Sequence, residues 1–193
     1  MRISRINGHL TEPFKYYSEE DGEKFYISSF KIEDGLTIPV ISSEYIKEDT
    51  ADRLLLTGHL CSSNRWANAQ GRSKLFTFFR IRKIEHESEE EPVKKLININ
   101  GKIINVMPIE VANNGIEYLT LIAKEYYDYT KTSIIHYNAS GALARKLSAT
   151  IKVGDNVTGK GILHARGKTY EVALSDLKLR QKKGGNRNEL TQG

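Results

Sequence analysis

Cationic and aromatic side chains interleave between Arg53 and Ile84, a stretch with seven basic residues and no acidic one. Lysine and arginine neutralise phosphates, and an aromatic ring beside them can stack on a base, which contributes about 1–3 kcal/mol per base. The residues of this kind are Arg65, Trp66, Arg72, Lys74, Phe76, Phe78, Arg80 and Arg82. Their types and spacing predict a surface that binds an anionic polymer.

Strand alternation would divide residues 74–82 between two faces. Leu75, Thr77, Phe79 and Ile81 would point into the core. The opposite face would hold Phe76 and Phe78 among cations, and exposing two phenylalanines is costly unless a ligand stacks on them. The alternative is a β-bulge that reverses the register and buries one of the two rings.

Other chemistries have weaker signals. The segment 154–160 fits seven positions of a phosphate-binding loop, but Gly161 stands where the metal-ligating hydroxyl belongs, and a strand pattern follows. The five histidines have no i, i+4 pair and no cysteine partners, and Cys61 has no base beside it in the sequence. We therefore expect no enzyme activity, no metal and no cofactor.

The second half reads as five strands around one helix. The strands are expected at about 96–106, 116–126, 132–137, 157–164 and 169–179. Asn138 can cap the helix, with Ala139, Leu143 and Leu147 on its buried face. Three strands, a helix and two strands are the layout of an OB-fold, a five-stranded Greek-key barrel.

The first half repeats this pattern at low identity. Residues 6–10 (INGHL) match 99–103 (INGKI), Gly58 matches Gly161, and residues 79–81 match 172–174. We predict an all-β protein of two tandem OB-folds, with one short helix in each. The expected parts are a first domain at 1–84, a solvated acidic linker at 85–94, a second domain at 95–179 and a basic flexible tail at 180–193.

The ordered motifs of the second half resemble the bacterial single-stranded DNA-binding protein family. They are Ile134–Tyr137, the helix, Lys152–Asp155, Gly161–Leu163 and Thr169–Val172. In that family, barrel aromatics stack on bases. The resemblance implies this role for Tyr127 and Tyr137, for Trp66 and for its weaker counterpart Tyr170. The first half has no aromatic that matches Tyr137, and Ile41 is near that place.

Further cations accompany these tyrosines in the second half. They are Lys131, Lys160, Arg166 and Lys168. Tyrosines in a barrel are often merely half-buried strand residues, so both interpretations remain open here. The resembled family also ends in an acidic tip that recruits partners, whereas this chain has Glu189 as the single acid after Lys178.

Composition limits the remaining classes. The chain has 193 residues, a net charge of +5, one cysteine, no apolar run long enough to span a bilayer and no leader-like start. We expect a cytoplasmic, non-membrane protein that binds single-stranded DNA without sequence preference in replication, recombination or mobile-element transfer. A homodimer would supply the four OB-folds usual in that family, and replication or recombination proteins are candidate partners. The rival predictions are a protein-interaction module of a primosome and an RNA-binding barrel.

Overall fold

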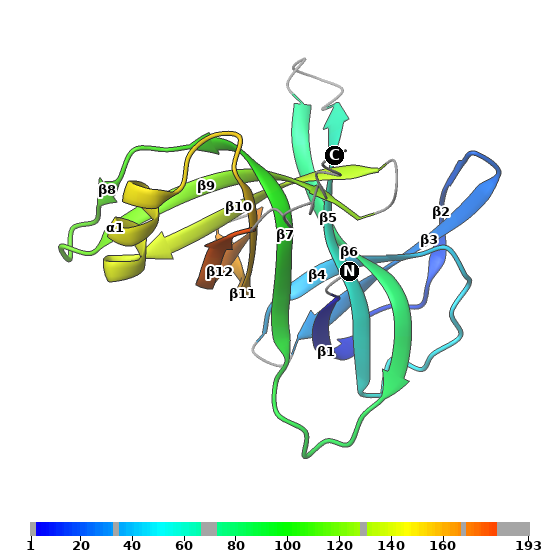
Figure 1. The fold of residues 1–193 in the computed structure, drawn as a ribbon. Helices are drawn as coiled ribbons and strands as arrows, with labels where there is room; N and C mark the ends of the chain where they lie inside the picture. The colour runs from blue at the N-terminus through cyan, green and yellow to red at the C-terminus, as the bar shows by residue number, and fades with distance from the viewer. Residues whose placement is uncertain (1–2, 33–34, 67–72, 128–130, 167–168, 181–193) are drawn as a thin grey trace, which may run out of the picture.

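The computed structural model describes residues 3–32, 35–66, 73–127, 131–166 and 169–180. For residues 64–66, 73–74, 166 and 169 it describes the backbone alone. The described elements are strands with one helix, and they form two barrels that lie side by side (Figure 1). No helix in these described ranges has the length and apolarity needed to cross a membrane.

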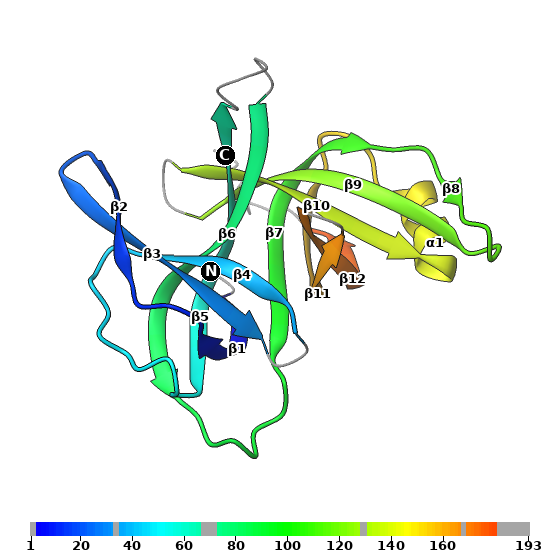
Figure 2. The same cartoon turned by 180° about the vertical axis from the view of Figure 1, so that it is seen from behind.

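The first barrel closes on itself through five strands. Its ring order is β1-β3-β4-β6-β5, closed by β1 pairing with both β3 and β5. β2 adds a hairpin arm to β3 and projects away from the barrel (Figure 2). The strands are β1 (Ser4–Leu10), β2 (Lys15–Glu20), β3 (Glu23–Ile32), β4 (Thr37–Ser42), β5 (Leu54–Trp66) and β6 (Ser73–His86).

The second barrel repeats the same ring as β7-β9-β10-β12-β11, with β8 added at the edge of β9. Its strands agree closely with the predicted ranges because the alternation and the turn residues are local signals. They are β7 (Lys95–Val106), β8 (Glu110–Val111), β9 (Glu117–Tyr126), β10 (Thr132–Ser140), β11 (Asn156–Arg166) and β12 (Thr169–Leu179).

The helix α1 (Gly141–Thr150) begins later than the sequence indicated. Ser140 is its N-cap residue, and the predicted cap, Asn138, instead lies in β10, where its Oδ1 accepts a hydrogen bond from Thr120. The buried residues of the helix are Ala144 and Leu147. The prediction was wrong about the start because β10 continues to pair with β9 as far as Ser140.

The expected helix of the first barrel is absent from the described residues. Residues 43–53, between β4 and β5, form an irregular segment. Apart from Tyr45, Ile46 and Ala51 its sequence is polar or charged, so it offers no apolar stripe to bury. A turn at Asp49, whose carboxylate accepts the Ala51 N–H, takes the place of a helical turn.

The predicted internal repeat is confirmed by strand register. Val40 pairs with Phe79 across the parallel β4–β6 contact, and Tyr137 pairs with Val172 across the equivalent β10–β12 contact. The residue that matches Tyr137 is therefore Val40 and not Ile41. Both barrels also carry a bulge just before the matched glycines Gly58 and Gly161.

The matched glycines are required by close packing. A Cβ on Gly58 would lie 2.0 Å from the Arg80 carbonyl oxygen, and one on Gly161 would lie 2.5 Å from that of Ala173. Only glycine lets the two strands approach this closely. The repeat therefore preserves a packing requirement that both barrels share.

The acidic connection between the barrels is fastened to the first barrel. Glu87 accepts hydrogen bonds from Asn7 (2.7 Å) and from Lys94. The buried guanidinium of Arg53 donates to the carbonyl oxygens of Glu89 and Glu91. Residues 88–93 are nevertheless exposed, and these contacts fasten the connection because the buried polar side chains of Asn7 and Arg53 need partners.

The barrels also contact each other directly. β1 pairs with β7 through Arg5–Leu96 and Ile6–Lys95. At a second junction the Ser62 hydroxyl donates to the Ile134 carbonyl oxygen (2.7 Å), and the Ser133 hydroxyl accepts the Ser62 N–H (3.0 Å). These contacts fix β5 of the first barrel against the tip of the β9–β10 hairpin of the second.

Candidate nucleic-acid interface

The strand β6 keeps the alternation that its sequence predicts. Phe79 (0% exposed) and Ile81 (7%) point into the first barrel. The bulge at Thr57–Gly58 falls beyond Ile81, so it does not reverse the register of the two phenylalanines. Arg82 is the extra residue of this bulge, and its side chain is exposed.

The opposite face of β6 is covered, which corrects the expectation that it is exposed. Phe78 and Arg80 are each 8% exposed. Phe78 belongs to a second apolar cluster with Phe25, Ile41 and Cys61, and the half-buried ring of Phe76 stacks on Phe78 at 5.6 Å. The alternation was right, but the sequence could not indicate that another part of the chain covers this face.

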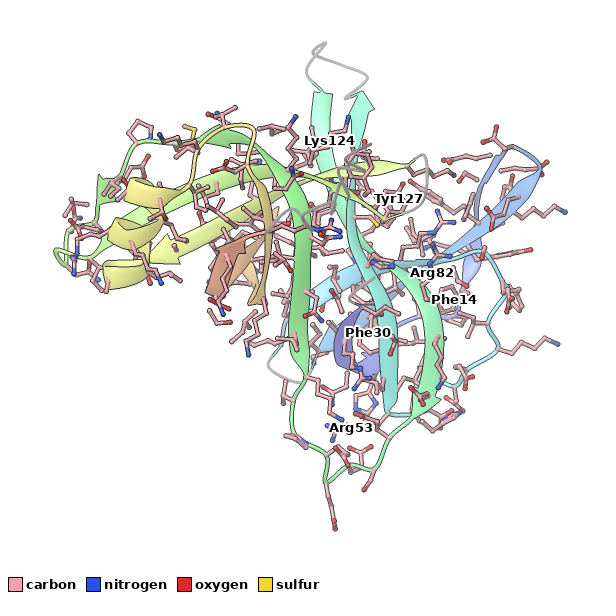
Figure 3. All side chains as sticks on the ribbon, in the orientation of Figure 1. Phe14, Phe30, Arg53, Arg82, Lys124 and Tyr127 are labelled. Atoms are coloured by element: carbon pink, nitrogen blue, oxygen red, sulfur yellow. The ribbon has the colours of Figure 1, made fainter. Side chains whose placement is uncertain are left out.

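The cover comes partly from the tip of the β9–β10 hairpin. Tyr127 packs against the second cluster, 5.8 Å from the Arg80 guanidinium. Arg82 donates to the Tyr127 carbonyl oxygen at 3.3 Å, and Figure 3 places these two side chains at the junction of the barrels. Lys131 lies 5.4 Å from the Phe25 ring and pairs with Glu20 at 3.2 Å. These predicted site residues therefore meet one another at an interface between the two barrels.

Tyr137 is fully buried in the second barrel, so its predicted contact with a base is wrong. Its hydroxyl donates to the Glu125 carboxylate, and burial, followed by that carboxylate, raises its pKa well above the usual value. Burial likewise raises the pKa of Glu125 to about 7, against the lowering effect of the bonds from Tyr137 and the Asn100 N–H. Successive residues of a strand point to opposite faces. His136 and Asn138 lie on the outer face of β10, so Tyr137 between them points into the barrel.

The outer side of the β9–β10 hairpin is the surface that the sequence reasoning missed. We call it the β9–β10 face, and its aromatic and cationic residues are Tyr118 (38% exposed), Lys124 and Tyr126 (53%). The Lys124 ammonium lies 5.9 Å from the Tyr126 ring centroid. Across the ladder, Lys124 stands opposite Ile134. Ile122 and Thr120, on the same face of β9, stand opposite His136 and Asn138. The alternation of β9 could have identified this face from the sequence.

A cavity of about 540 Å³ opens at one end of the β9–β10 face. Tyr118, Thr120 and Asn138 line it, together with His164 of β11 and Glu171 of β12. The buried Nδ2 of Asn138 has no hydrogen-bond partner in the described structure, while its Oδ1 is held by Thr120 at 2.6 Å. The cavity thus combines an aromatic ring with an amide donor that a ligand could satisfy.

The corresponding face of the first barrel is filled. By register, Thr120 and Asn138 match Ile27 and Ile41, and His164 with Glu171 matches Cys61 with Phe78. The first-barrel residues are apolar and pack against Tyr17 and Tyr127, which leaves a cavity of about 80 Å³. The same position of the fold is therefore closed in one barrel and open in the other.

The other predicted site residues are distributed as follows. Lys160 is exposed on β11, and Tyr170 is half-buried, with its hydroxyl donating to the Thr37 carbonyl oxygen and its pKa raised by burial. Arg65, Trp66 and Lys74 lie in the extended arm of β5 and β6, and Arg166 lies at the end of β11, with only their backbones described. Arg72 and Lys168 lie outside the described residues.

Two features considered for catalysis have structural roles. Cys61 is buried in the second cluster, and burial raises the pKa of its thiol to about 12, so the nucleophilic thiolate does not form near neutrality. Residues 153–154 form a turn, and residues 156–160 are the first residues of β11, so a strand follows this turn, as the sequence indicated, and not a helix.

The architecture defines the chain as a tandem OB-fold, which confirms the predicted class. It is similar to the wild-type single-stranded DNA-binding protein of Thermus aquaticus, with a TM-score of 0.72 and 15% identity over 97% of this chain and 98% of that chain. It is also similar to a deletion mutant of that protein, with a TM-score of 0.73 and 14% identity over the same shares. A scan against protein-family models and a search of the curated proteins find no match. At this level of identity the likeness establishes the fold.

Proposed function

We propose that this protein binds single-stranded DNA through the β9–β10 face of its second barrel. The observation that carries the proposal is the exposed ring of Tyr126, with Lys124 beside it, on the strand pair that OB-folds use for oligonucleotides. Tyr118 and the cavity beside it extend the surface along the same two strands. Stacking on tyrosine needs only a π-face, so the binding would tolerate any base sequence.

The arm of β5 and β6 would continue the interface. Ser62 joins β5 to the edge of β10, and the arm runs on from there to Trp66 and the cations predicted to accompany it. A strand crossing the β9–β10 face would then reach this arm. The proposed contribution of Trp66, Arg65, Arg72 and Lys74 rests on the sequence pattern and on this continuity.

The likeness to the Thermus aquaticus protein, which is a single-stranded DNA-binding protein, supports the same ligand for this chain. The proposed activity is binding without chemistry, since Cys61 is protonated and buried and the glycine-rich turn lacks a following helix. Action in replication, recombination or mobile-element transfer stays a prediction.

The test compares three tyrosine variants of the full chain. Fluorescence anisotropy of a labelled oligo(dT) would be measured for Tyr126→Ala and Tyr118→Ala, with Tyr45→Ala as the control because that ring is 51% exposed on the first barrel. The first two should each weaken binding by about 1–3 kcal/mol, and the control should bind as the parent does. Equal affinities for the parent and all three folded variants would exclude the β9–β10 face.

A second candidate function is a protein-interaction module. Phe78 and Arg80 already serve as a contact surface for another barrel, although within one chain. In that case oligo(dT) affinity would be weak and insensitive to salt, whereas phosphate contacts make it fall steeply with salt. Labelled RNA and duplex DNA in the same assay separate DNA binding from the RNA-binding alternative.

A further inference from the structure

Three metal-ligating side chains meet at the end of the first barrel where β5 begins and β6 ends. They are Glu48 and Asp52, from the irregular segment 43–53, and His86, the last residue of β6. Their ligand atoms all lie within 4.8 Å of one another, and the His86 Nε2 lies 3.2 Å from a Glu48 oxygen. One imidazole and two carboxylates form a donor set that suits a first-row divalent cation.

The main chain holds these residues in place. Leu54 pairs with His86 in the β5–β6 ladder, and the Glu87 N–H donates to the Arg53 carbonyl oxygen at 3.0 Å. The Asp52 N–H donates to the Asp49 carbonyl oxygen at 3.2 Å. Asp52 and His86 are therefore brought together by the start of β5 and the end of β6, independently of any contact between their side chains.

A histidine next to Asp52 fixes it further. The Nδ1 of His9 lies 3.1 Å from the Asp52 carbonyl oxygen, which makes Nδ1 the protonated nitrogen. This bond holds the main chain that carries a ligand, as outer groups do at metal sites. His9 acts here as a positioning residue and not as a ligand.

The charge of the cluster is not balanced by lysine or arginine. Within the described ranges, neither Glu48 nor Asp52 forms an ion pair with either type of side chain, and the side chain beside Glu48 is His86, with the His86 Nε2 3.2 Å from a Glu48 oxygen. The two carboxylates therefore carry negative charges that no lysine or arginine of the described ranges offsets. A bound divalent cation would neutralise them.

We propose that Glu48, Asp52 and His86 bind Zn²⁺, which ties the segment 43–53 to the end of β6. In the second barrel the helix α1 occupies the connection between β10 and β11. The equivalent connection of the first barrel, residues 43–53 between β4 and β5, contains no helix in the described residues. The zinc would stabilise this connection where an apolar helix face is missing. Solvent would complete the four ligands that Zn²⁺ prefers, since three protein ligands leave one position open.

The test is calorimetry and thermal unfolding of the full chain, prepared with a chelator and then titrated with Zn²⁺. We expect one site per chain and a midpoint that rises by roughly 5–10 °C at a 100-fold excess over the dissociation constant. His86→Gln and Asp52→Asn should each remove the site. Neither side chain belongs to a barrel core, and Asp52→Asn keeps the carbonyl oxygen that His9 contacts.

Matched controls are His164→Gln, an exposed histidine of β11, and Glu44→Gln, an exposed acid of the same segment. Both should retain the site. Zinc binding that is equal in all the variants would mean adventitious surface binding and would overturn the proposal, as would the absence of a site in the parent. Equally tight binding of Mg²⁺ would also overturn it, because that ion does not favour imidazole.

Discussion

Tyr126 and Tyr127 are consecutive residues with opposite surroundings. Tyr126 is 53% exposed on the outer side of β9, and the Lys124 ammonium lies 5.9 Å from its ring. Tyr127 packs on the apolar cluster that contains Phe78 of the first barrel. A change of one position in the chain thus separates a residue available to a ligand from one that joins the barrels.

The arm of β5 and β6 supplies the first prediction. Trp66→Ala should weaken oligo(dT) binding by about 1–3 kcal/mol, the contribution of stacking on one base. The variant should keep the unfolding midpoint of the parent, because Trp66 is the last residue of β5, in the arm of β5 and β6. Anisotropy with labelled oligo(dT) measures the loss, and an unchanged affinity in a folded variant would exclude stacking on Trp66.

The two arginines of β6 should behave differently. Arg82 is exposed, so Arg82→Ala should lower the slope of log K against log salt by about 0.7 if it contacts one phosphate. Arg80 is buried, 4.8 Å from the Phe25 ring and 3.7 Å from a Glu23 oxygen. Arg80→Ala should instead cost about 1–2 kcal/mol of unfolding free energy.

Salt titrations of oligo(dT) binding and urea unfolding separate these two effects. A lower salt slope for Arg80→Ala with unchanged stability would contradict its assignment to the barrel interface. Lys83→Ala is the control, since Lys83 is exposed and its ion-pair partner, Glu85, is a surface carboxylate.

The buried carboxyl of Glu125 predicts a pH dependence of stability. Burial raises its pKa from 4.5 to about 7, so the folded state favours the protonated form. Its stabilising contribution is present in full below pH 4.5 and is lost as the pH rises through about 7, by at most about 3 kcal/mol. Glu125→Gln, which stays neutral, should remove this part of the pH dependence.

Urea unfolding at pH 5 and pH 8 measures that difference. The exposed Glu85→Gln serves as the control and should retain the pH dependence of the parent. If the parent and Glu125→Gln lose the same free energy between the two pH values, Glu125 does not titrate in this range.

Assembly is the fourth prediction. We expect a homodimer, with four OB-folds per particle, and a mass of twice 21.9 kDa by light scattering. Unpaired strand edges would favour a dimer, but β1 and β7 already pair their edges within one chain. A surface that remains for a second copy is the exposed cross-strand pair Leu96 (39%) and Ile162 (43%).

Ile162→Glu should therefore give particles of single-chain mass without unfolding the barrels. If the parent protein has the mass of one chain at micromolar concentration, the predicted homodimer is wrong.

The sequence by itself determined the barrels and their repeat. β7, β9 and β12 lie within one residue of the predicted ranges, and the matched glycines Gly58 and Gly161 stand at equivalent bulges. These features depend on residues close together in the chain: period-two alternation, turn residues and the lack of space for a Cβ. Such local signals can be interpreted without knowing what lies across the molecule.

The tertiary structure alone decided which faces are open. The alternation of β6 placed Phe78 and Arg80 on one side, but first-barrel side chains and the β9–β10 tip of the other barrel together cover that side. The residues 43–53 form no helix, and they bring Glu48 and Asp52 to His86 of a distant strand. Burial and ligand geometry depend on contacts between residues far apart in the chain, and the local pattern of either segment does not contain them.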